Sequence, residues 1–468
     1  MTPPLPARHG SDHPTLLGRR EFLLASTAAA LLAACGDGDA SSSPARVGVT
    51  GALPEPTGAL VTRWGRDPFS RGSYSHLAVG STPADRDALR ADVDGRLFIA
   101  GEATSVDYSG TAHGALLEGR DAADRIEAAG DVDDEIVVIG AGLAGLAAAR
   151  RLHDGGRRVR VLEARDRLGG RIHTVDDLGV AVDRGATWIH GDDGNPMMEL
   201  VDDAGATTAV TDFDDVVVYD ADGAVVDPDD VDELVTALSE LAEESDENEV
   251  IADAVSGALA DADERTRTLA GYVVTSVVEH DEAADAADLT FASILTGEEF
   301  GGDELLLPNG FSQLVEPVAD GLDVELGQVV SLIEVDLDEV RITTSDGGLV
   351  VADRVLVTLP LGVLQAGDVE FVPALPEATV DAIDRLGMGT LDRVVLRFDE
   401  RFWDEADVVG FAGRPPGRFA EWIDLTDVVG APVLMGFNAG VAAGELDDLD
   451  DDAVVAEAMR VLATIYEN

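Results

Sequence analysis

The chain has 468 residues, with 92 acidic and 32 basic side chains and a formal net charge of −60. It contains no lysine, so every basic residue in that count is an arginine. Such a chain repels nucleic acid and anionic lipid headgroups, and its self-repulsion weakens the fold at low ionic strength. The composition therefore excludes a nucleic-acid-binding protein and favours a globular protein of two domains adapted to high salt, with attraction of cationic ligands as a second explanation.

Residues 1–34 are predicted to be an export signal. Arg19-Arg-Glu-Phe-Leu-Leu24 resembles a twin-arginine motif, and the apolar stretch from Phe22 to Ala34 is too short to span a bilayer as a helix. Leu32-Ala-Ala-Cys35 resembles a lipoprotein box, and Cys35 is the only cysteine. We therefore expect no intramolecular disulfide, a lipid on Cys35, a linker over residues 35–52, and a location on the outer face of the cell membrane.

A dinucleotide-binding fingerprint begins at residue 135. Ile136 to Ile139 is an apolar, β-branched run typical of a buried parallel strand, and a G-x-G-x-x-G motif follows it at Gly140, Gly142 and Gly145. The first two glycines permit a tight turn and the close approach of a pyrophosphate to backbone N–H groups. The third permits the following helix, residues 146–153, to pack on the sheet.

A second strand, Arg158–Leu162, places Glu163 where a carboxylate accepts hydrogen bonds from ribose hydroxyls. Strand, glycine turn, helix, second strand and terminal acid thus form one βαβ unit. Together they predict a bound dinucleotide.

The next segment, Ala164-Arg-Asp-Arg-Leu-Gly-Gly-Arg-Ile-His-Thr174, resembles the flavin-dependent amine oxidases. The resemblance implies that the dinucleotide is FAD. It also implies that Gly169, Gly170 and Arg171 lie along the diphosphate, with Arg165 among the cofactor-binding residues.

Further motifs along the chain carry the same resemblance. Gly185-Ala-Thr-Trp-Ile-His-Gly191 is similar to a stretch that the branch of polyamine oxidases and lysine-specific histone demethylases places beside the isoalloxazine. The other matching segments are 307–314, 330–333, 359–364, 386–391, 401–403, 61–75, 100–104 and 109–115. By resemblance, the further cofactor-binding residues are Gly185, Ala186, Thr187, Trp188, Val330, Gly101, Glu102, Thr111 and Ala112.

The order of these motifs is inverted relative to the family. In the family the glycine fingerprint opens the fold and a segment like Ala100–Thr104 closes it, whereas here residues 53–130 precede residues 131–468. We therefore expect a circular permutant in which Asn468 lies near Leu53. Because Ala45–Ala52 faintly resembles another fingerprint, a trimmed duplication or a rearranged gene is an alternative origin.

The predicted fold class is α/β, with a Rossmann-like FAD-binding domain interleaved with an α+β substrate domain in permuted order. Apolar residues at helical spacing predict helices between Asp229 and His280. The predicted FAD-binding segments are 70–130 within the permuted segment 53–130, then 131–205 and 303–369. The predicted substrate-domain segments are 206–302 and 370–468, with 53–69.

By resemblance, the catalytic residues are Tyr74, His190 and Arg393, and Trp64 joins Tyr74 and His190 in the substrate pocket. Simple core packing is the alternative for Trp64 and His190. Ser73 stands where some members of the family carry a flavin-linking cysteine, so the FAD is expected to be noncovalent.

Arg393 departs from the family, which has a lysine at this position that holds a water against the flavin and assists reoxidation by oxygen. Arginine keeps the positive charge, but its planar guanidinium is not equivalent to an amine. The electron acceptor, oxygen or another molecule, therefore stays open.

The resemblance implies an enzyme that oxidises a primary or secondary amine to an imine, which water hydrolyses to an aldehyde or ketone. Polyamines are the favoured substrates, and no metal site is predicted. An L-amino acid oxidase on the same fold is the alternative enzyme, followed by a flavin desaturase. A non-catalytic, rearranged flavoprotein is the alternative outside enzymes.

Overall fold

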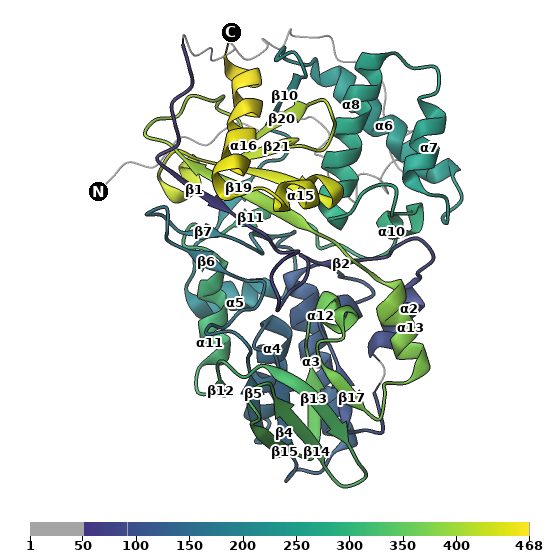
Figure 1. The fold of residues 1–468 in the computed structure, drawn as a ribbon. Coiled ribbons are helices and arrows are strands. Elements are labelled where there is room, and N and C mark those ends of the chain that lie inside the picture. Colours follow the sequence, from purple (N-terminus) through teal and green to yellow (C-terminus); the bar gives the residue numbers. More distant parts are fainter. Residues whose placement is uncertain (1–50, 91, 468) are drawn as a thin grey trace.

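The chain folds into two lobes and passes between them repeatedly (Figure 1). The computed structural model describes residues 51–90 and 92–467, so the predicted signal segment and Cys35 lie outside the described residues. Both lobes contain helices and strands, mixed along the chain. The predicted mixed α/β class is therefore confirmed.

One lobe is built on a five-stranded sheet with the order β12-β5-β4-β16-β3 and every neighbouring pair parallel. Its strands are β3 (Leu97–Ile99), β4 (Glu135–Ile139), β5 (Arg158–Leu162), β12 (Asp323–Glu325) and β16 (Arg354–Val357). The helices α3 (Ala112–Ala129) and α4 (Leu143–Asp154) pack against each other beside it. Both strands predicted around the glycine motif are confirmed, as β4 and β5. Because β3 precedes β4 in sequence, the segment before the fingerprint supplies an edge strand of this sheet.

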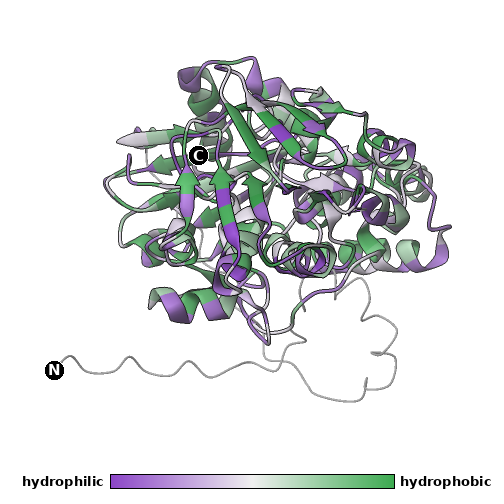
Figure 2. Cartoon of the chain, turned by 90° about the horizontal axis from the view of Figure 1, so that it is seen from below, coloured by the Kyte–Doolittle hydropathy of each residue, from purple (hydrophilic) through white to green (hydrophobic). Residues whose placement is uncertain are grey.

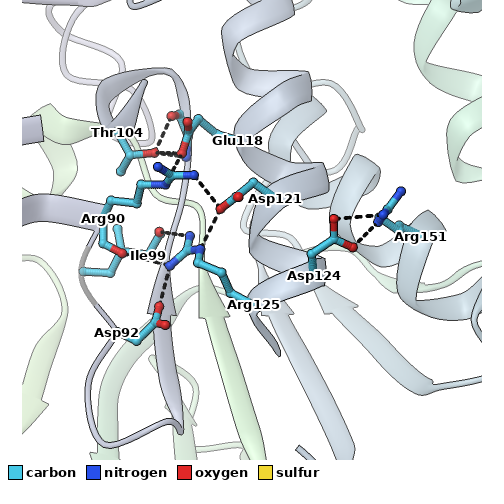
Figure 3. A network of polar contacts seen from close by, with 10 residues as sticks. Arg90, Asp92, Ile99, Thr104, Glu118, Asp121, Asp124, Arg125 and Arg151 are labelled. Atoms are coloured by element: carbon cyan, nitrogen blue, oxygen red, sulfur yellow. Dashed lines mark hydrogen bonds and ion pairs between the residues drawn. The ribbon is translucent and has the colours of Figure 1, made fainter. Parts of the chain in front are cut away.

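A network of ion pairs joins Arg90 and strand β3 to α3, and α3 to α4 (Figure 3). Arg90 lies 2.7 Å from the carboxylate of Asp121 and 3.2 Å from that of Glu118, and Arg125 also contacts Asp121 at 2.7 Å. Arg125 donates a further hydrogen bond to the backbone oxygen of Ile99 in β3. The edge strand is therefore held by charged side chains as well as by its backbone pairing.

The other lobe is built on a six-stranded sheet with the order β1-β19-β22-β21-β20-β10. Its strands are β1 (Gly58–Val61), β10 (Val216–Asp220), β19 (Leu391–Arg397), β20 (Val408–Ala412), β21 (Glu421–Asp424) and β22 (Val433–Ala439). The helices of this lobe are α6 (Pro228–Glu244), α7 (Ile251–Ala258), α8 (Glu264–Val274), α15 (Gly440–Asp447) and α16 (Asp451–Tyr466). A π-helical turn, η2 (Thr275–Glu279), continues α8. The helices predicted between Asp229 and His280 are confirmed.

The predicted domain boundary at residue 370 is too early. Strand β17 (Glu370–Val372) pairs with β13 (Val330–Val335) in a four-stranded sheet completed by β14 (Val340–Thr344) and β15 (Leu349–Ala352). Helix α13 (Glu377–Arg385) packs on α2 (Pro83–Arg90), and its buried residues share a core with β4 and β16. The chain therefore leaves the parallel-sheet lobe only at β19, because residues 370–386 bury their apolar side chains there.

Short elements connect the lobes or cap them. The strands are β2 (Ser75–His76), β6 (Thr174–Val175), β7 (Val182–Asp183), β8 (Trp188–Ile189), β9 (Ala209–Thr211), β11 (Glu304–Leu306) and β18 (Gly387–Met388). The helices are α5 (Met197–Ala204), α9 (His280–Glu282), α10 (Phe291–Leu295), α11 (Val315–Ala319), α12 (Leu361–Ala366) and α14 (Thr426–Val429), with short 3₁₀ turns η1 (Glu102–Thr104) and η3 (Phe311–Leu314).

The two sides of the predicted join lie together. The backbone N–H of Leu53 donates to the carboxylate of Glu467 at 2.8 Å, and α16 packs against β1. Asn468 lies outside the described residues, but the expected proximity is confirmed for Glu467. No helix among residues 51–90 and 92–467 is long and apolar enough to cross a membrane.

Hydropathy follows this architecture: hydrophobic stretches run along many of the strands, and hydrophilic residues mark the outer helices and loops (Figure 2). In the six-stranded lobe Asp404 is one of the buried polar groups. The Asp404 carboxylate accepts hydrogen bonds from the hydroxyls of Tyr219 in β10 and Tyr466 in α16, at 2.7 and 2.9 Å. All three residues are buried, so this carboxylate ties the last helix to the sheet.

We predict that Asp404→Ala lowers the free energy of unfolding by about 2–4 kcal/mol, because two buried hydroxyls lose their acceptor at once. Asp448→Ala is the matched control: it removes an exposed carboxylate paired with Arg66, and we expect a change below about 1 kcal/mol. Denaturant unfolding in molar salt measures both values. Equal effects of the two substitutions would contradict this role for Asp404.

Candidate active site

A cavity of about 1330 Å³ is lined by residues of both lobes. All of the predicted site residues within the described chain except Gly145 line it. The motif around Glu102 and the glycine fingerprint therefore line the same cavity. This volume exceeds that of an ordinary small-ligand pocket.

The glycine turn has the geometry that the sequence predicts for the approach of a phosphate. Gly140 has φ +107°, and a Cβ there would lie 2.6 Å from the Thr358 hydroxyl. A Cβ on Gly142 would meet nothing within 4 Å, so this backbone faces open space at the start of α4. Gly145 differs, because its Cβ would lie 2.0 Å from the Gly140 oxygen and the residue does not line the cavity. Gly145 therefore serves helix packing and is not a cofactor contact.

Glu163 is buried beside this turn. Its carboxylate accepts hydrogen bonds from the backbone N–H groups of Ala141 at 2.6 Å and Arg165 at 2.9 Å. The Arg165 guanidinium is bound by both carboxylate oxygens of Asp67, at 2.7 and 2.8 Å. Arg165 therefore lines the cavity as half of an ion pair that joins residues 164–174 to the segment before β2.

Arg171 and Glu102 form a second ion pair, 2.7 Å long, across the same space. Glu102 also accepts hydrogen bonds from the Ser75 hydroxyl and the Gly110 backbone, while Arg171 donates to the Ser73 oxygen. Burial raises the pKa of Glu102, but the charge and hydrogen bond of Arg171 and the Ser75 hydroxyl outweigh it and hold that pKa below its ordinary value. Glu102 is therefore ionised and held by donors from several chain segments.

The remaining predicted cofactor residues surround these pairs. Thr111 caps the N-terminus of α3 by accepting from the Gly114 N–H. The Ser73 hydroxyl donates to the Leu391 oxygen and accepts from the Leu391 N–H, so it is engaged in backbone hydrogen bonds. The others on the cavity wall are Gly101, Ala112, Gly169, Gly170, Gly185, Ala186, Thr187, Trp188 and Val330.

Arg393 and Tyr74 stand at one end of the cavity, near the ring of Phe437. Arg393 is buried; its Nη1 donates to the Asp183 oxygen at 3.1 Å and to the Thr187 hydroxyl, and its guanidinium carbon lies 5.3 Å from the Phe437 ring centre. Its Nε has no hydrogen-bond partner among the described residues. Burial lowers the pKa of Arg393 to about 10. We name the part of the cavity lined by Tyr74, Trp188, His190, Arg393 and Phe437 the amine end.

His190 faces the cavity, with 56% of its side chain exposed to that open space. Its Nδ1 lies 2.8 Å from the carboxylate of Glu304. Burial lowers the pKa of His190, but Glu304 and, more weakly, Asp281 and Glu299 raise it above its ordinary value. The cavity-facing position disfavours simple core packing for His190. Trp64 also lines the cavity, and its indole N–H donates to the Arg184 oxygen.

Sequence reasoning missed several polar residues of the amine end. His280 and Glu421 are both buried and lie 2.6 Å apart, and Ser276 donates to the same carboxylate. Glu421 was visible as an acid inside an apolar strand, but nothing local indicated that His280 would meet it.

A cluster of rings also lines the cavity. Tyr108 and Phe300 stack with their ring centres 4.8 Å apart, and both make edge contacts with His113.

Carboxylates also line the cavity around the amine end. They come from Asp212, Asp214, Asp232, Asp281, Glu298, Glu299, Asp303, Glu304 and Glu421. In the described part of the chain, no group of three or more His, Cys, Asp or Glu side chains is placed to hold a metal ion. These carboxylates give the cavity an acidic lining.

The family model for flavin-containing amine oxidoreductases matches residues 47–127 and 143–468. The chain belongs to this family. It is therefore an amine oxidase, and members of the family bind FAD. The open backbone at Gly142, the partly buried Arg171 and the buried Glu102 fit that cofactor.

Relatives and solved structures agree with this assignment. A probable polyamine oxidase 4 of Arabidopsis thaliana is 31% identical over 359 residues, 72% of this amine oxidase and 72% of the relative. Lysine-specific histone demethylase 2 of Homo sapiens is 33% identical over 362 residues, 71% of this chain and 44% of that protein. The structure of cyclohexylamine oxidase from Brevibacterium oxydans IH-35A superposes with a TM-score of 0.58 at 22% identity, covering 72% of this chain and 82% of that one.

We predict that Glu304→Gln lowers the pKa of His190 toward its ordinary value, because the main neighbouring charge is removed while the weaker effects of Asp281 and Glu299 remain. In the unsubstituted enzyme the raised pKa stabilises the fold at pH values below the ordinary pKa of histidine. That contribution is lost as the pH rises through the folded-state pKa.

An NMR titration of the imidazole protons in molar salt measures the change. Glu316→Gln, on the exposed face of α11, is the control and should leave the His190 titration in place. A His190 titration that is the same in both variants would show that Glu304 does not set this pKa.

Proposed function

We propose that this amine oxidase acts on cationic amines with more than one nitrogen, with polyamines favoured. The observation that carries the proposal is the lining of carboxylates around the amine end. Each carboxylate attracts an ammonium group, and several of them along one wall match a substrate whose charges are spaced along a chain. The similarity to polyamine oxidases supports the same substrate class.

Of the four cavity-lining arginines within the described residues, three are paired with a carboxylate, and Arg393 donates to neutral oxygens through Nη1. Arg71 pairs with Asp368, Arg165 with Asp67 and Arg171 with Glu102, and Arg393 donates to Asp183 and Thr187. An L-amino acid oxidase needs a cation that is free to bind the substrate carboxylate. This arrangement therefore favours the amine over the amino acid.

In the proposed reaction, bound FAD would supply the acceptor for the hydride equivalent that leaves the carbon next to the substrate nitrogen. The chain's own residues hold the cofactor and orient the amine. The glycine turn and Arg171 would contact the diphosphate, Glu163 and Glu102 would contact the ribose and ribityl hydroxyls, and Thr111 and Ala112 would line the ring end. Noncovalent binding fits Ser73, which carries no thiol and is hydrogen-bonded to Leu391.

Tyr74 and Trp188 would flank the amine, with His190 beside it. Arg393 supplies a fixed positive charge at the end of the cavity where the family has a lysine. Its Nε, which has no partner among the described residues, is the donor that could hold a water or an acceptor molecule. The electrons would then pass to oxygen or to another acceptor molecule.

We predict that the flavin absorbance of the enzyme, purified in molar salt, bleaches anaerobically with spermidine. It should bleach much more slowly with monoamines and not with amino acids, because only polyamines use several carboxylates at once. Admitting air should restore the colour if oxygen is the acceptor. A yellow protein bleached by amino acids alone would overturn the proposal in favour of an amino acid oxidase, and one bleached by neither class would leave only a flavin-binding protein.

We further propose that the parallel-sheet lobe is a Rossmann-like FAD-binding domain and that the chain is a circular permutant. The support is the position of β3, which pairs with β16 although it precedes the fingerprint in sequence, and the contact between Leu53 and Glu467. The present connection between α3 and β4 is only the short loop 130–134. It could therefore be opened while the ends near Leu53 and Glu467 are joined.

We predict that a rejoined chain, residues 131–468 followed directly by 53–130, folds and binds FAD with an unchanged visible spectrum. Its free energy of unfolding should differ by about 1 kcal/mol or less, because only short connections change. Spectra and denaturant unfolding of both chains in molar salt measure this. A rejoined chain that is colourless while the present order is yellow would contradict the permutation.

A further inference from the structure

A buried histidine and glutamate pair stands at the amine end, on the π-helical turn η2 (Thr275–Glu279). The backbone N–H of His280 donates to the Thr275 oxygen, five residues back, as a π-helix requires. This turn presents Ser276 and His280 to one carboxylate. The Ser276 hydroxyl lies 2.7 Å from Glu421 Oε1, and His280 Nδ1 lies 2.6 Å from Glu421 Oε2.

The pair lies beside residues already placed at the amine end. The Tyr74 hydroxyl donates to the backbone oxygen of His280. The His280 ring centre lies 5.9 Å from that of Phe437, whose ring also contacts the guanidinium of Arg393. His280, Ser276 and Glu421 all line the cavity.

One nitrogen of His280 has no protein partner. With Nδ1–H donated to the Glu421 carboxylate, Nε2 carries the lone pair and is an acceptor. Nε2 is buried and has no hydrogen-bond partner among the described residues, although His280 is only 5% exposed. A buried acceptor without a partner costs free energy, and His280 lines the cavity, so a ligand in the cavity that donates to Nε2 would remove this cost.

An amine substrate meets the enzyme as an ammonium ion, because alkylamines have a pKa of about 10. An ammonium nitrogen has no lone pair, and the carbon next to it cannot give up a hydride until the nitrogen is neutral. The reaction proposed above therefore needs a proton acceptor at the amine end.

We infer that His280 is this acceptor: its Nε2 takes one proton from the substrate ammonium, and Glu421 holds the ring and balances the imidazolium charge. The N–H bond of the ammonium breaks, its electron pair stays on the substrate nitrogen, and a new N–H bond forms at Nε2. No electron is transferred in this step. The inference rests on the proposed function, because it assigns a role within amine oxidation.

The charged groups around His280 are mainly acidic. Glu421 faces it from β21, and Glu279, Asp281 and Glu282 belong to its own turn and to α9. The Tyr74 phenol reaches its backbone, and Arg393 of β19 lies beyond the Phe437 ring of β22. The groups nearest the ring are therefore carboxylates, and Arg393 is separated from it by an aromatic side chain.

The test compares kcat/KM for spermidine in wild type and His280→Asn from pH 7 to 9 in molar salt. We expect a loss of about 100-fold at pH 7, within the usual contribution of a general base. The logarithm of kcat/KM of the variant should then rise by about one unit for each pH unit, because only the small neutral fraction of the amine reacts, while wild type stays nearly flat. His153→Asn, on the exposed part of α4, is the matched control and should behave as wild type.

Parallel pH profiles of wild type and His280→Asn, at any size of loss, would overturn the inference, since a merely structural role lowers activity equally at every pH. If wild type bleaches with no amine, the proposed function itself fails, which is a different result. Glu421→Gln is nearly isosteric and tests the same step should the first variant not fold. Its pH profile should bend in the same direction with about a tenfold loss at pH 7, and a profile parallel to that of wild type would contradict the inference.

A second measurement does not depend on turnover. tert-Butylamine cannot be oxidised, because its carbon next to nitrogen carries no hydrogen. In ¹⁵N-histidine-labelled holoenzyme, with the His280 signals assigned by His280→Asn, Nε2 should move from the unprotonated to the protonated region when this amine is added. An Nε2 signal that is protonated beforehand, or that does not change at saturation, would overturn the inference.

Discussion

The ion pair between Glu102 and Arg171 is the interaction on which the rest of the site depends. Glu102 follows β3, and Arg171 lies beyond β5, so the pair closes the carboxyl-end edge of the parallel sheet across the cavity. Ser73, Ser75 and Gly110 bind to the same two side chains. Glu102 is the buried member of this pair, so removal of Arg171 would leave its charge in the interior without a compensating cation.

This pair also joins the two parts of the chain whose order we propose to be permuted. Residues 53–130 supply Glu102 and Asp67, and residues 131–468 supply Arg171 and Arg165. Two arginines from one motif therefore hold two acids from the other part. The cavity wall is continuous across the junction because these charges meet, whichever part comes first along the chain.

Beyond these pairs the cavity is acidic, in keeping with a chain whose net charge is −60. The balance of charge differs between its two ends. At the cofactor end the acids are matched by arginines or backbone N–H groups. At the amine end the carboxylates outnumber the cations, and Glu304 and Glu421 each bind a histidine. The salt adaptation predicted from the composition would account for acids on the outer surface, but it does not account for Glu421, which is buried in a central strand.

The sequence alone determined the family, the cofactor and most of the cofactor wall. Local patterns are sufficient for these features, because the glycine turn, the strand before it and Glu163 all lie within one βαβ unit. The tertiary structure alone decided that residues 370–386 stay with the parallel-sheet lobe and that His280 meets Glu421. Each of these depends on a contact between segments far apart in sequence, and no local pattern encodes such a distance.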